Sequence, residues 1–287
     1  MSTQAPALPR PARSGFSALL AETRTLYVRS MRKLMRRPIA LYFSLIQPMI
    51  WLLLFGQIFN RITRFPGAAH AFGDISYFQF FMPAVILQTV LFGAGQSGLG
   101  ILNDMDSGFL DKLLTTPIHR VAILLGRILG DLTRLVAQGV VIVLLAWIFG
   151  QGQEPRVHYA YGLPGVLGAL CIALLFGLGL AGLNIFIALR TRSSESTFLV
   201  ANFLTLPLLF TSSAQLPLEL LPHWLQQTAR FNPVTYAVNA MRFFFNGPNA
   251  VPGLEPTREI SWALAYLGAI ALVTMTIAVR SFRRNIR

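Results

Sequence analysis

Six apolar stretches, each long enough to cross a bilayer, fill most of this chain and leave few alternatives for its fold. About 20 apolar residues span a hydrocarbon core of roughly 30 Å. Five stretches contain no Asp, Glu, Lys or Arg, namely residues 39–59, 77–102, 159–189, 196–216 and 260–279. The sixth, 121–149, is charged only in its first half, so we expect its membrane part to begin near Leu135. The sequence therefore predicts an all-α membrane protein with six transmembrane helices.

Positive charge between these stretches lies mainly on one side. The N-terminus, the connections after the second and fourth spans and the C-terminus hold 18 Lys and Arg residues, whereas the other three connections hold 6. Because cytoplasmic segments carry the excess of basic residues, we expect both termini to be cytoplasmic. The net charge of +13 then reflects topology and contact with anionic lipids, and it gives no indication of nucleic-acid binding.

Residues 1–38 differ from a cleavable signal, because no apolar core precedes Ile39. Beyond a Pro-rich start, basic residues surround apolar ones at helical spacing, and these apolar positions are Phe16, Leu19, Leu20, Tyr27, Met31 and Leu34. The pattern predicts an N-terminal amphipathic interfacial helix on the cytoplasmic leaflet, separated by Pro38 from the first span. Its charge either sets topology alone or also docks a partner, and both interpretations remain open.

The sequence contains no catalytic constellation. The segment Gly95-Gln96-Ser97-Gly98 is similar to the GxSG of intramembrane serine proteases, which need a histidine base at comparable depth, but no histidine lies inside a span. The four histidines are too scattered to suggest a metal site. A single cysteine, Cys171, excludes a disulfide within one chain. We expect no enzymatic activity from this chain.

A transporter of this composition needs an external driving force. Proton- and ion-coupled carriers place ionisable groups at mid-membrane, and five of the six spans have none. Nucleotide binding would need a P-loop, yet neither Lys33 nor Lys112 closes a GxxxxGK[ST] motif. We therefore expect no cofactor in this chain, and any ATP and Mg²⁺ must be bound by a partner polypeptide.

The connection after the second span, residues 103–120, predicts a short helix. Its first residues are acidic or hydroxylated and suit a helix N-terminus. The apolar residues Phe109, Leu110, Leu113 and Leu114 then share one face. Thr116 followed by Pro117 predicts the cap and first residue of the next helix. The short amphipathic helix lies along the membrane surface or is presented to a partner, and composition alone leaves both open.

Two segments resemble the permease subunit of type-2 ATP-binding-cassette (ABC) exporters, especially daunorubicin-resistance membrane subunits. They are GFLDKLLTTPIHR at 108–120 and FNPVTYAVNAMR at 231–242, within the six-span layout. The resemblance implies a homodimer of permeases with two nucleotide-binding ATPase subunits, in the bacterial inner membrane. It also implies that the leading helix is a second ATPase contact, and that a coupling helix docks the ATPase through Phe109, Leu110, Leu113, Leu114, Thr115, Pro117 and Arg120.

We expect the helix of the third span to extend well into the cytoplasm. Residues 117–150 number 34 and would form a helix about 50 Å long, which exceeds the thickness of the hydrocarbon core. Arg127, Asp131 and Arg134 lie on one face of that extension, together with Arg120. Pairing of Asp131 with its arginine neighbours, or contact with headgroups, is one interpretation. Transmission of motion from a docked ATPase is the other.

Residues 218–246 predict two short outer-leaflet helices between spans five and six. Pro222 and Pro233 suit helix starts, Asn232 suits the cap of the second helix, and Trp224 and Tyr236 suit headgroup depth. In the family such helices re-enter the outer leaflet, so Trp224, Asn232, Pro233 and Tyr236 are candidates for an outer gate. A structural lid is the simpler alternative.

The residues expected to pack helices together and those expected to line a transport path lie in different spans. Span four repeats small residues every fourth position, which favours close packing within the chain, and they are Gly165, Ala169, Ala173, Gly177 and Ala181. Spans one, two and five instead carry uncharged polar residues that need partners or a cavity. We expect a mostly apolar substrate path lined by Gln47, Gln88, Asn202 and Thr205.

The predicted organisation is a tail and interfacial helix over 1–38, a six-span permease domain over 39–280 and a cytoplasmic C-terminus over 281–287. The predicted function is export of a hydrophobic or amphipathic compound by alternating access. Export of a lipid-linked saccharide is the alternative within the same class. A stand-alone channel or membrane scaffold is the alternative from another class.

Overall fold

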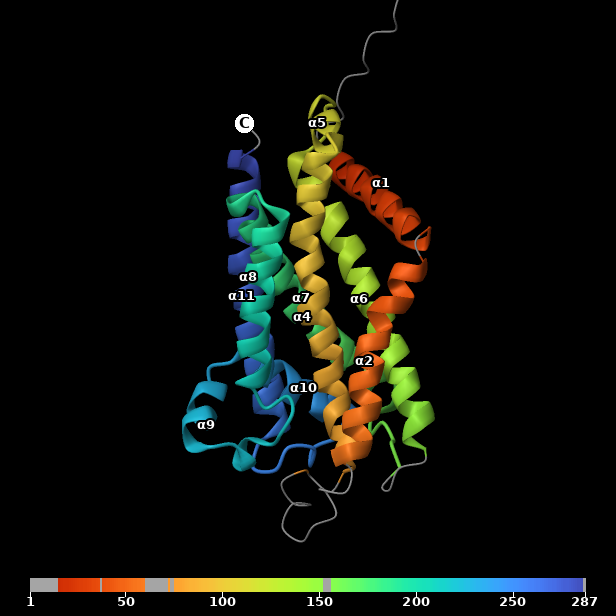
Figure 1. The fold of residues 1–287 in the computed structure, drawn as a ribbon, viewed down its shortest axis with the longest axis vertical. Coiled ribbons are helices and arrows are strands. Elements are labelled where there is room, and N and C mark those ends of the chain that lie inside the picture. Colours follow the sequence, from red (N-terminus) through yellow and green to blue (C-terminus); the bar gives the residue numbers. More distant parts are fainter. Residues whose placement is uncertain (1–14, 37, 60–71, 73–74, 152–155, 286–287) are drawn as a thin grey trace, which may run out of the picture.

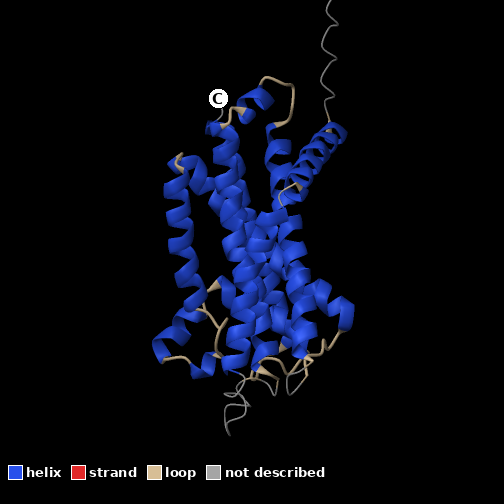
Figure 2. Cartoon of the chain, turned by 45° about the vertical axis from the view of Figure 1, so that its right-hand side comes forward, coloured by secondary structure: helices blue, strands red, loops and turns tan. Residues whose placement is uncertain are grey.

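The computed structural model describes residues 15–36, 38–59, 72, 75–151 and 156–285, and these are almost entirely helical, with no strand (Figure 2). The elements, in chain order, are α1 (Phe16–Met35), α2 (Pro38–Ile58), α4 (Tyr77–Asp106), α5 (Phe109–Leu114), α6 (Arg120–Gly150), α7 (Gly162–Thr191), α8 (Ser194–Phe210), the 3₁₀ turn η2 (Leu218–Leu220), α9 (His223–Ala229), α10 (Pro233–Asn246) and α11 (Pro256–Asn285).

Each predicted span is a helix, and the all-α fold is confirmed. Among the described residues, α4, α6, α7 and α11 are long and apolar enough to cross a membrane, whereas Tyr42–Ile58 of α2 and Ser194–Phe210 of α8 are shorter. The fifth span ends at Phe210 rather than at position 216. At this end of α8, the hydroxyls of Thr211 and Ser212 donate to the carbonyls of Pro207 and Leu209.

Helix α7 lies at the centre of the bundle and contacts α4, α6, α8, α10 and α11. Its small-residue stripe is buried along its whole length, as the packing interpretation predicted. A Cβ at Gly165 would overlap the carbonyl of Phe244 in α10, and one at Gly177 would lie 3.1 Å from a methyl of Val90 in α4. Side chains this small let neighbouring helices approach closely enough to fill the core.

The two ends of the bundle differ (Figure 1). Helices α1 and α5 and the C-terminal end of α11 lie at one end, which we call the α5 end, and α9 and α10 lie at the other, the α9 end. Helix α6 has 31 residues, about 46 Å. Helix α1 packs along the part of α6 nearest the α5 end, where Gly126 and Gly130 allow the two backbones to come close.

Two details between α4 and α6 were predicted incorrectly. The acidic residues from position 103 onward end α4, which continues to Asp106, instead of capping the next helix. Helix α5 begins after Gly108, whose φ of 63° is left-handed and favours glycine. Helix α6 starts at Arg120 with His119 at the N-cap, not at Thr116 and Pro117, because the threonine hydroxyl at 116 donates to the carbonyl of Leu113 and completes α5.

Candidate functional site

The predicted docking residues divide between the core and the surface. The apolar face of α5 points inward, with Leu110 only 4% exposed in a cluster with residues of α4, α6, α7 and α11, and Leu114 packed against that cluster. Phe109 and Leu113 are half-buried. Thr115, Pro117 and Arg120 are exposed, as are Asp111 and Lys112. A partner that approaches α5 would therefore meet its polar side and the following turn, and the apolar face anchors α5 to the bundle.

Helix α1 is joined to the connection around α5 at two points. The guanidinium of Arg29 lies 3.3 Å from the ring centroid of Phe109. Farther along, a carboxylate oxygen of Glu22 accepts from the backbone N–H of His119 at 2.8 Å and lies 3.0 Å from its Nδ1. Since His119 precedes the first turn of α6, this carboxylate also faces the positive end of the α6 dipole. Displacement of α5 would therefore act on both α1 and α6.

Three charged residues of α6 bond across to α4 and not to one another, whereas Arg120 donates to the carbonyl of Arg283 in α11 at 3.4 Å. Arg127 donates to Asp104 at 2.5 Å, and Asp131 accepts from the hydroxyl of Ser97 at 2.7 Å. Arg134 donates to the carbonyl of Gly93 at 2.9 Å. The predicted pairing of Asp131 with its arginine neighbours is thus absent among the described residues.

Two small residues of α4 contribute to its contact with α6. Ser97 is a hydrogen-bond donor across the α4–α6 contact. Gly100 leaves the space that the Arg127 side chain fills, since a Cβ at this position would overlap its guanidinium.

The four predicted path residues lie on α2, α4 and α8. These helices are neighbours, since α4 contacts both α2 and α8 (Figure 1). Gln88 of α4 is 5% exposed and makes no hydrogen bond to other described residues. Asn202 and Thr205 of α8 donate to carbonyls four residues earlier in their own helix, at 2.9 and 2.8 Å. Gln47 of α2 is exposed. The structure brings their helices together without joining the four side chains in one cluster.

Gln47 lies on a surface that is otherwise apolar. The exposed large hydrophobic residues of α2 include Tyr42, Phe43, Ile46 and Ile50, and α8 has a similar exposed set that includes Phe203. In a bilayer such faces meet acyl chains or another protein surface. An amide facing acyl chains would lose its water hydrogen bonds without replacement, at a cost of several kcal/mol.

The predicted outer helices α9 and α10 form, but they lie in different environments. Asn232 caps α10 by accepting from the N–H of Val234 at 2.9 Å, and Pro233 is its first residue, both as predicted. Its amide also donates to the carbonyl of Leu208 at 2.7 Å, which fixes α10 to the end of α8. Tyr236 is half-buried and donates to a carbonyl in the turn before α10. Trp224 of α9 is 66% exposed, whereas most of α10 is buried within the bundle.

Arg242 in α10 is 1% exposed and has no carboxylate partner among the described residues. Its guanidinium donates to carbonyls of Phe80, Ser213 and Ala214 and to the side-chain oxygen of Asn239, at 2.9 to 3.3 Å. Burial lowers its pKa to about 9, which still leaves the group charged at neutral pH. This side chain joins α4, α10 and the segment after α8.

Several of these residues were not singled out by the sequence analysis. Gly126 and Gly130 form a small-xxx-small pair that could have predicted the α1–α6 contact. Gln138 of α6 donates to the hydroxyl of Ser44 in α2 at 2.6 Å, and no local pattern indicates that pairing. Buried Arg242 was counted among the charges of the connections and as the last residue of the segment 231–242, without a role of its own. No group of three His, Cys, Asp or Glu residues suited to a metal ion occurs in the described part of the chain.

Comparison with known proteins adds independent information. The model of the family described as ABC-2 type transporter matches residues 21–245. The daunorubicin resistance ABC transporter permease protein DrrB1 of Streptomyces coeruleorubidus is 30% identical over 240 residues, covering 83% of this chain and 78% of that protein. The putative transport permease ycf38 of Pyropia yezoensis is 29% identical over 265 residues, covering 91% and 86%. The probable doxorubicin resistance permease DrrC of Mycobacterium tuberculosis is 24% identical over 285 residues, covering 97% and 94%.

Proposed function

This chain belongs to the ABC-2 type transporter family and is thus a multi-pass permease that works with a separate ATP-binding subunit, and we propose on that premise that it exports hydrophobic or amphipathic compounds. The observation that carries the proposal is the arrangement of α2, α4 and α8, which lie side by side and whose apolar parts, residues 39–59, 77–102 and 196–210, carry few polar residues and no charged ones. Such a surface suits a ligand that is mostly apolar with a few hydrogen-bonding groups. Similarity to permeases named for daunorubicin and doxorubicin resistance points to the same class.

The ATPase subunit docks at the α5 end, in this proposal, and ATP and Mg²⁺ are bound there by that partner. The exposed turn of Thr115 and Pro117 and the polar side of α5 provide the contact, while Leu110 anchors α5 to the bundle. Movement of α5 then passes to α1 through the Arg29–Phe109 contact, and to α4 and α6 through the packing of Leu110 against both helices, which the Arg127–Asp104 pair joins. A rigid anchor of this kind converts nucleotide-driven motion of the partner into helix movement.

The substrate path runs along the exposed faces of α2 and α8, next to α4, in this proposal, where a second copy of the chain completes it. Gln47 supports this placement, because an amide on an otherwise apolar face is costly in contact with lipid and favourable facing a polar cavity or a partner. The α9 end is outermost, with Trp224, Asn232, Pro233 and Tyr236 at or near the exit. The 18-to-6 distribution of basic residues supports cytoplasmic termini in a bacterial inner membrane.

Transport by the reconstituted complex tests this function. Inside-out proteoliposomes that contain the permease and its ATPase should accumulate doxorubicin, or another cationic amphipathic dye, when ATP is added. Liposomes with either subunit alone should not. Accumulation without ATP would contradict an ATP-driven exporter, and would favour a channel.

The competing saccharide substrate is distinguished in the same preparation. A lipid-linked oligosaccharide that stimulates ATP hydrolysis, while amphipathic compounds have no effect on it, would contradict the proposed substrate class but leave the permease role intact. We expect the opposite order of stimulation, because the path carries no cationic side chain among its four predicted residues to meet a pyrophosphate linkage.

A further inference from the structure

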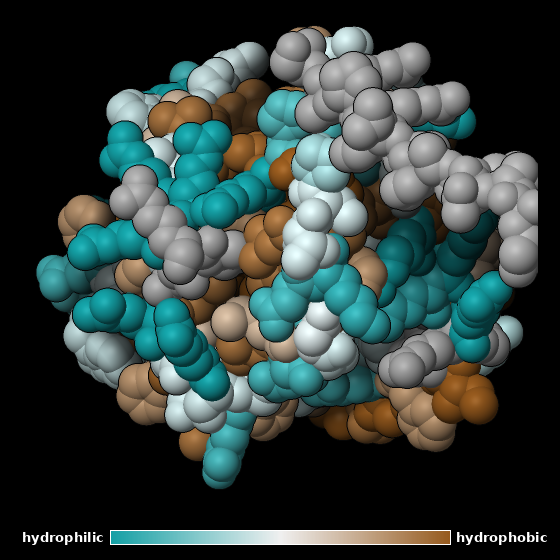
Figure 3. All heavy atoms as spheres, turned by 90° about the horizontal axis from the view of Figure 1, so that it is seen from above, coloured by the Kyte–Doolittle hydropathy of each residue, from teal (hydrophilic) through white to brown (hydrophobic). Residues whose placement is uncertain are grey.

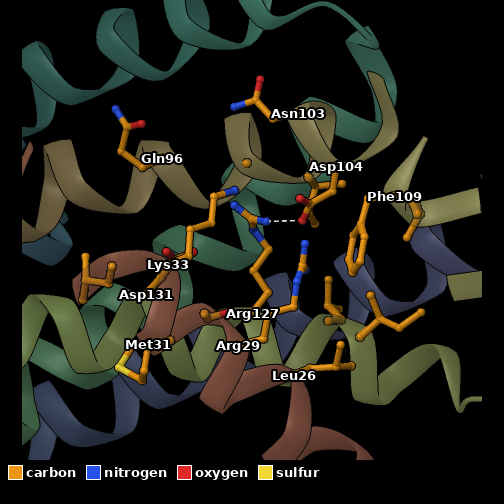
Figure 4. Close-up of a pocket in the computed structure, with 18 of the residues that line it drawn as sticks. Leu26, Arg29, Met31, Lys33, Gln96, Asn103, Asp104, Phe109, Arg127 and Asp131 are labelled. Carbon is orange, nitrogen blue, oxygen red and sulfur yellow. Dashed lines mark hydrogen bonds and ion pairs between the residues drawn. The ribbon is translucent and has the colours of Figure 1, made fainter. Parts of the chain in front are cut away.

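A cavity of about 290 Å³ lies at the α5 end, beneath α1 (Figure 4). Its walls come from α1, α4, α5 and α6, with smaller contributions from α2 and α11. It is distinct from the surface of α2, α4 and α8 proposed for transport. None of the functions described so far accounts for it.

The lining carries more positive than negative charge. Four cations face the cavity, Arg29, Lys33, Arg127 and Arg134, whereas two carboxylates do, Asp104 and Asp131. Only Arg127 forms an ion pair with either carboxylate in the described structure. The second carboxylate is bonded to the hydroxyl of Ser97. The lining therefore has an excess of two positive charges, and three of its four cations have no ion-pair partner among the described residues.

The cations of the lining are incompletely bonded. Figure 4 shows the Lys33 side chain extending toward the guanidinium of Arg127, although both are positive. The Nε atoms of Arg127 and Arg134 are buried and have no acceptor among the described residues. Like charges brought together in a partly enclosed site repel unless an anion lies between them, so this arrangement favours a bound anion.

The remaining lining is apolar and indicates where the anion comes from. Leu26, Ile101, Leu113 and Leu124 line the same cavity, and α1 has the composition of a helix that lies on a membrane surface. A phosphate held among the cations beside such a surface suits a lipid better than a free ion, because the attached chains would cover the apolar part. Basic pockets between helices near the cytoplasmic surface are typical sites for anionic headgroups.

We propose that this cavity binds the phosphate headgroup of one anionic phospholipid from the cytoplasmic leaflet, held by Lys33, Arg29 and Arg134 between α1 and α6. The lipid would fix α1 against the α4–α6 pair, next to the residues that move with α5. Only the assignment to the cytoplasmic leaflet rests on the proposed orientation. Binding itself is independent of transport, and is measurable without it.

Equilibrium binding of a short-chain fluorescent phosphatidylglycerol to the purified full chain, in neutral detergent, tests the site. We expect saturable binding of one lipid per chain, with phosphatidylcholine competing poorly. Lys33→Gln should weaken binding on the order of fivefold, the effect of one lost basic contact. Lys33→Arg should retain it. Arg32→Gln is the matched control, because Arg32 is the preceding residue on α1, is equally exposed and does not line the cavity.

Four results would overturn the proposal. Equal loss of affinity in Lys33→Gln and Arg32→Gln would mean that lipid meets the basic surface of α1 without a defined site. Equal affinity for phosphatidylcholine and phosphatidylglycerol would remove the role of headgroup charge. Competition by inorganic phosphate as effective as that by the lipid would assign the cavity to a free anion. Arg29→Gln should reproduce the loss seen at Lys33, and unchanged binding there would also contradict the proposed set of cations.

Discussion

Arg242 shows how one buried charge can hold an irregular part of a helical bundle. The segment after α8 is not helical, so its carbonyls have no partners within a helix. Arg242 supplies donors to two of these, at Ser213 and Ala214, and its guanidinium also lies 3.5 Å from the ring centroid of Phe80. A guanidinium can satisfy several acceptors at fixed angles, which an ammonium group cannot.

Replacement of Arg242 should therefore destabilise the protein strongly. We expect Arg242→Met to cost roughly 3 kcal/mol, because several buried acceptors lose their donor, and to lower the melting temperature by roughly 5 to 10 °C. Arg242→Lys should recover only part of this loss. Arg230→Met is the control, because Arg230 is exposed. The melting temperature of each purified variant is measured by heating samples and quantifying the remaining folded protein by size-exclusion chromatography. Equal melting temperatures for Arg242→Met and the unmodified protein would contradict the role given to Arg242.

Asn202 and Ala173 distinguish a path residue from a packing residue. Asn202 is half-buried on α8, whereas Ala173 is 4% exposed within the α7 stripe. Asn202→Trp should alter substrate-stimulated ATP hydrolysis of the assembled complex at nearly unchanged melting temperature. Ala173→Trp should instead lower stability by at least about 1 to 3 kcal/mol, since the core has no room for the ring. A normal substrate response in Asn202→Trp would place the path elsewhere.

At the scale of elements, α5 has an inner face that anchors it and an outer face that is free for a partner. The inward position of Leu110 and Leu114 means that charge placed there would test folding and not docking. The exposed Thr115 is the sharper site, because among the described residues its hydroxyl bonds only to the carbonyl of Lys112 in its own turn.

We expect Thr115→Lys to reduce co-purification of the ATPase subunit by at least about tenfold, since an added charge at a contact is left unpaired. The matched control is Thr228→Lys in α9, where an exposed threonine likewise bonds to a carbonyl of its own helix. Quantitative pull-down of the ATPase from detergent extracts measures both variants. Full recovery of the partner with Thr115→Lys would exclude this turn as the docking contact.

The sequence predicted elements better than it predicted contacts. Apolar length and the start of α10 at Asn232 and Pro233 depend on local chemistry and were correct, whereas the helix start predicted at Thr116 and Pro117 was wrong. The direction in which α5 faces was not predictable, because an amphipathic helix looks the same whether its apolar side meets the bundle or a partner. The Arg127–Asp104 pair joins residues 23 positions apart, and its formation depends on the relative register of two helices, which hydropathy does not specify.

At the scale of the whole molecule, the driving force lies outside this chain. The purified permease, free of any second subunit, should neither bind nor hydrolyse ATP, because the sequence contains no phosphate-binding loop. Equilibrium binding of a fluorescent ATP analogue and a phosphate-release assay measure the two activities. Saturable nucleotide binding by the pure chain would contradict this account of energy coupling.

The central claim is that the ATPase subunit binds at the α5 end of the bundle and that the α9 end faces outward. Site-specific photo-crosslinking in intact cells tests it most directly, with a photoreactive amino acid at Lys112 of α5 or at Gln227 of α9, both exposed. The account predicts a crosslink to the ATPase subunit from position 112 and none from position 227. A crosslink from 227, or none from 112 while the complex still co-purifies, would contradict it.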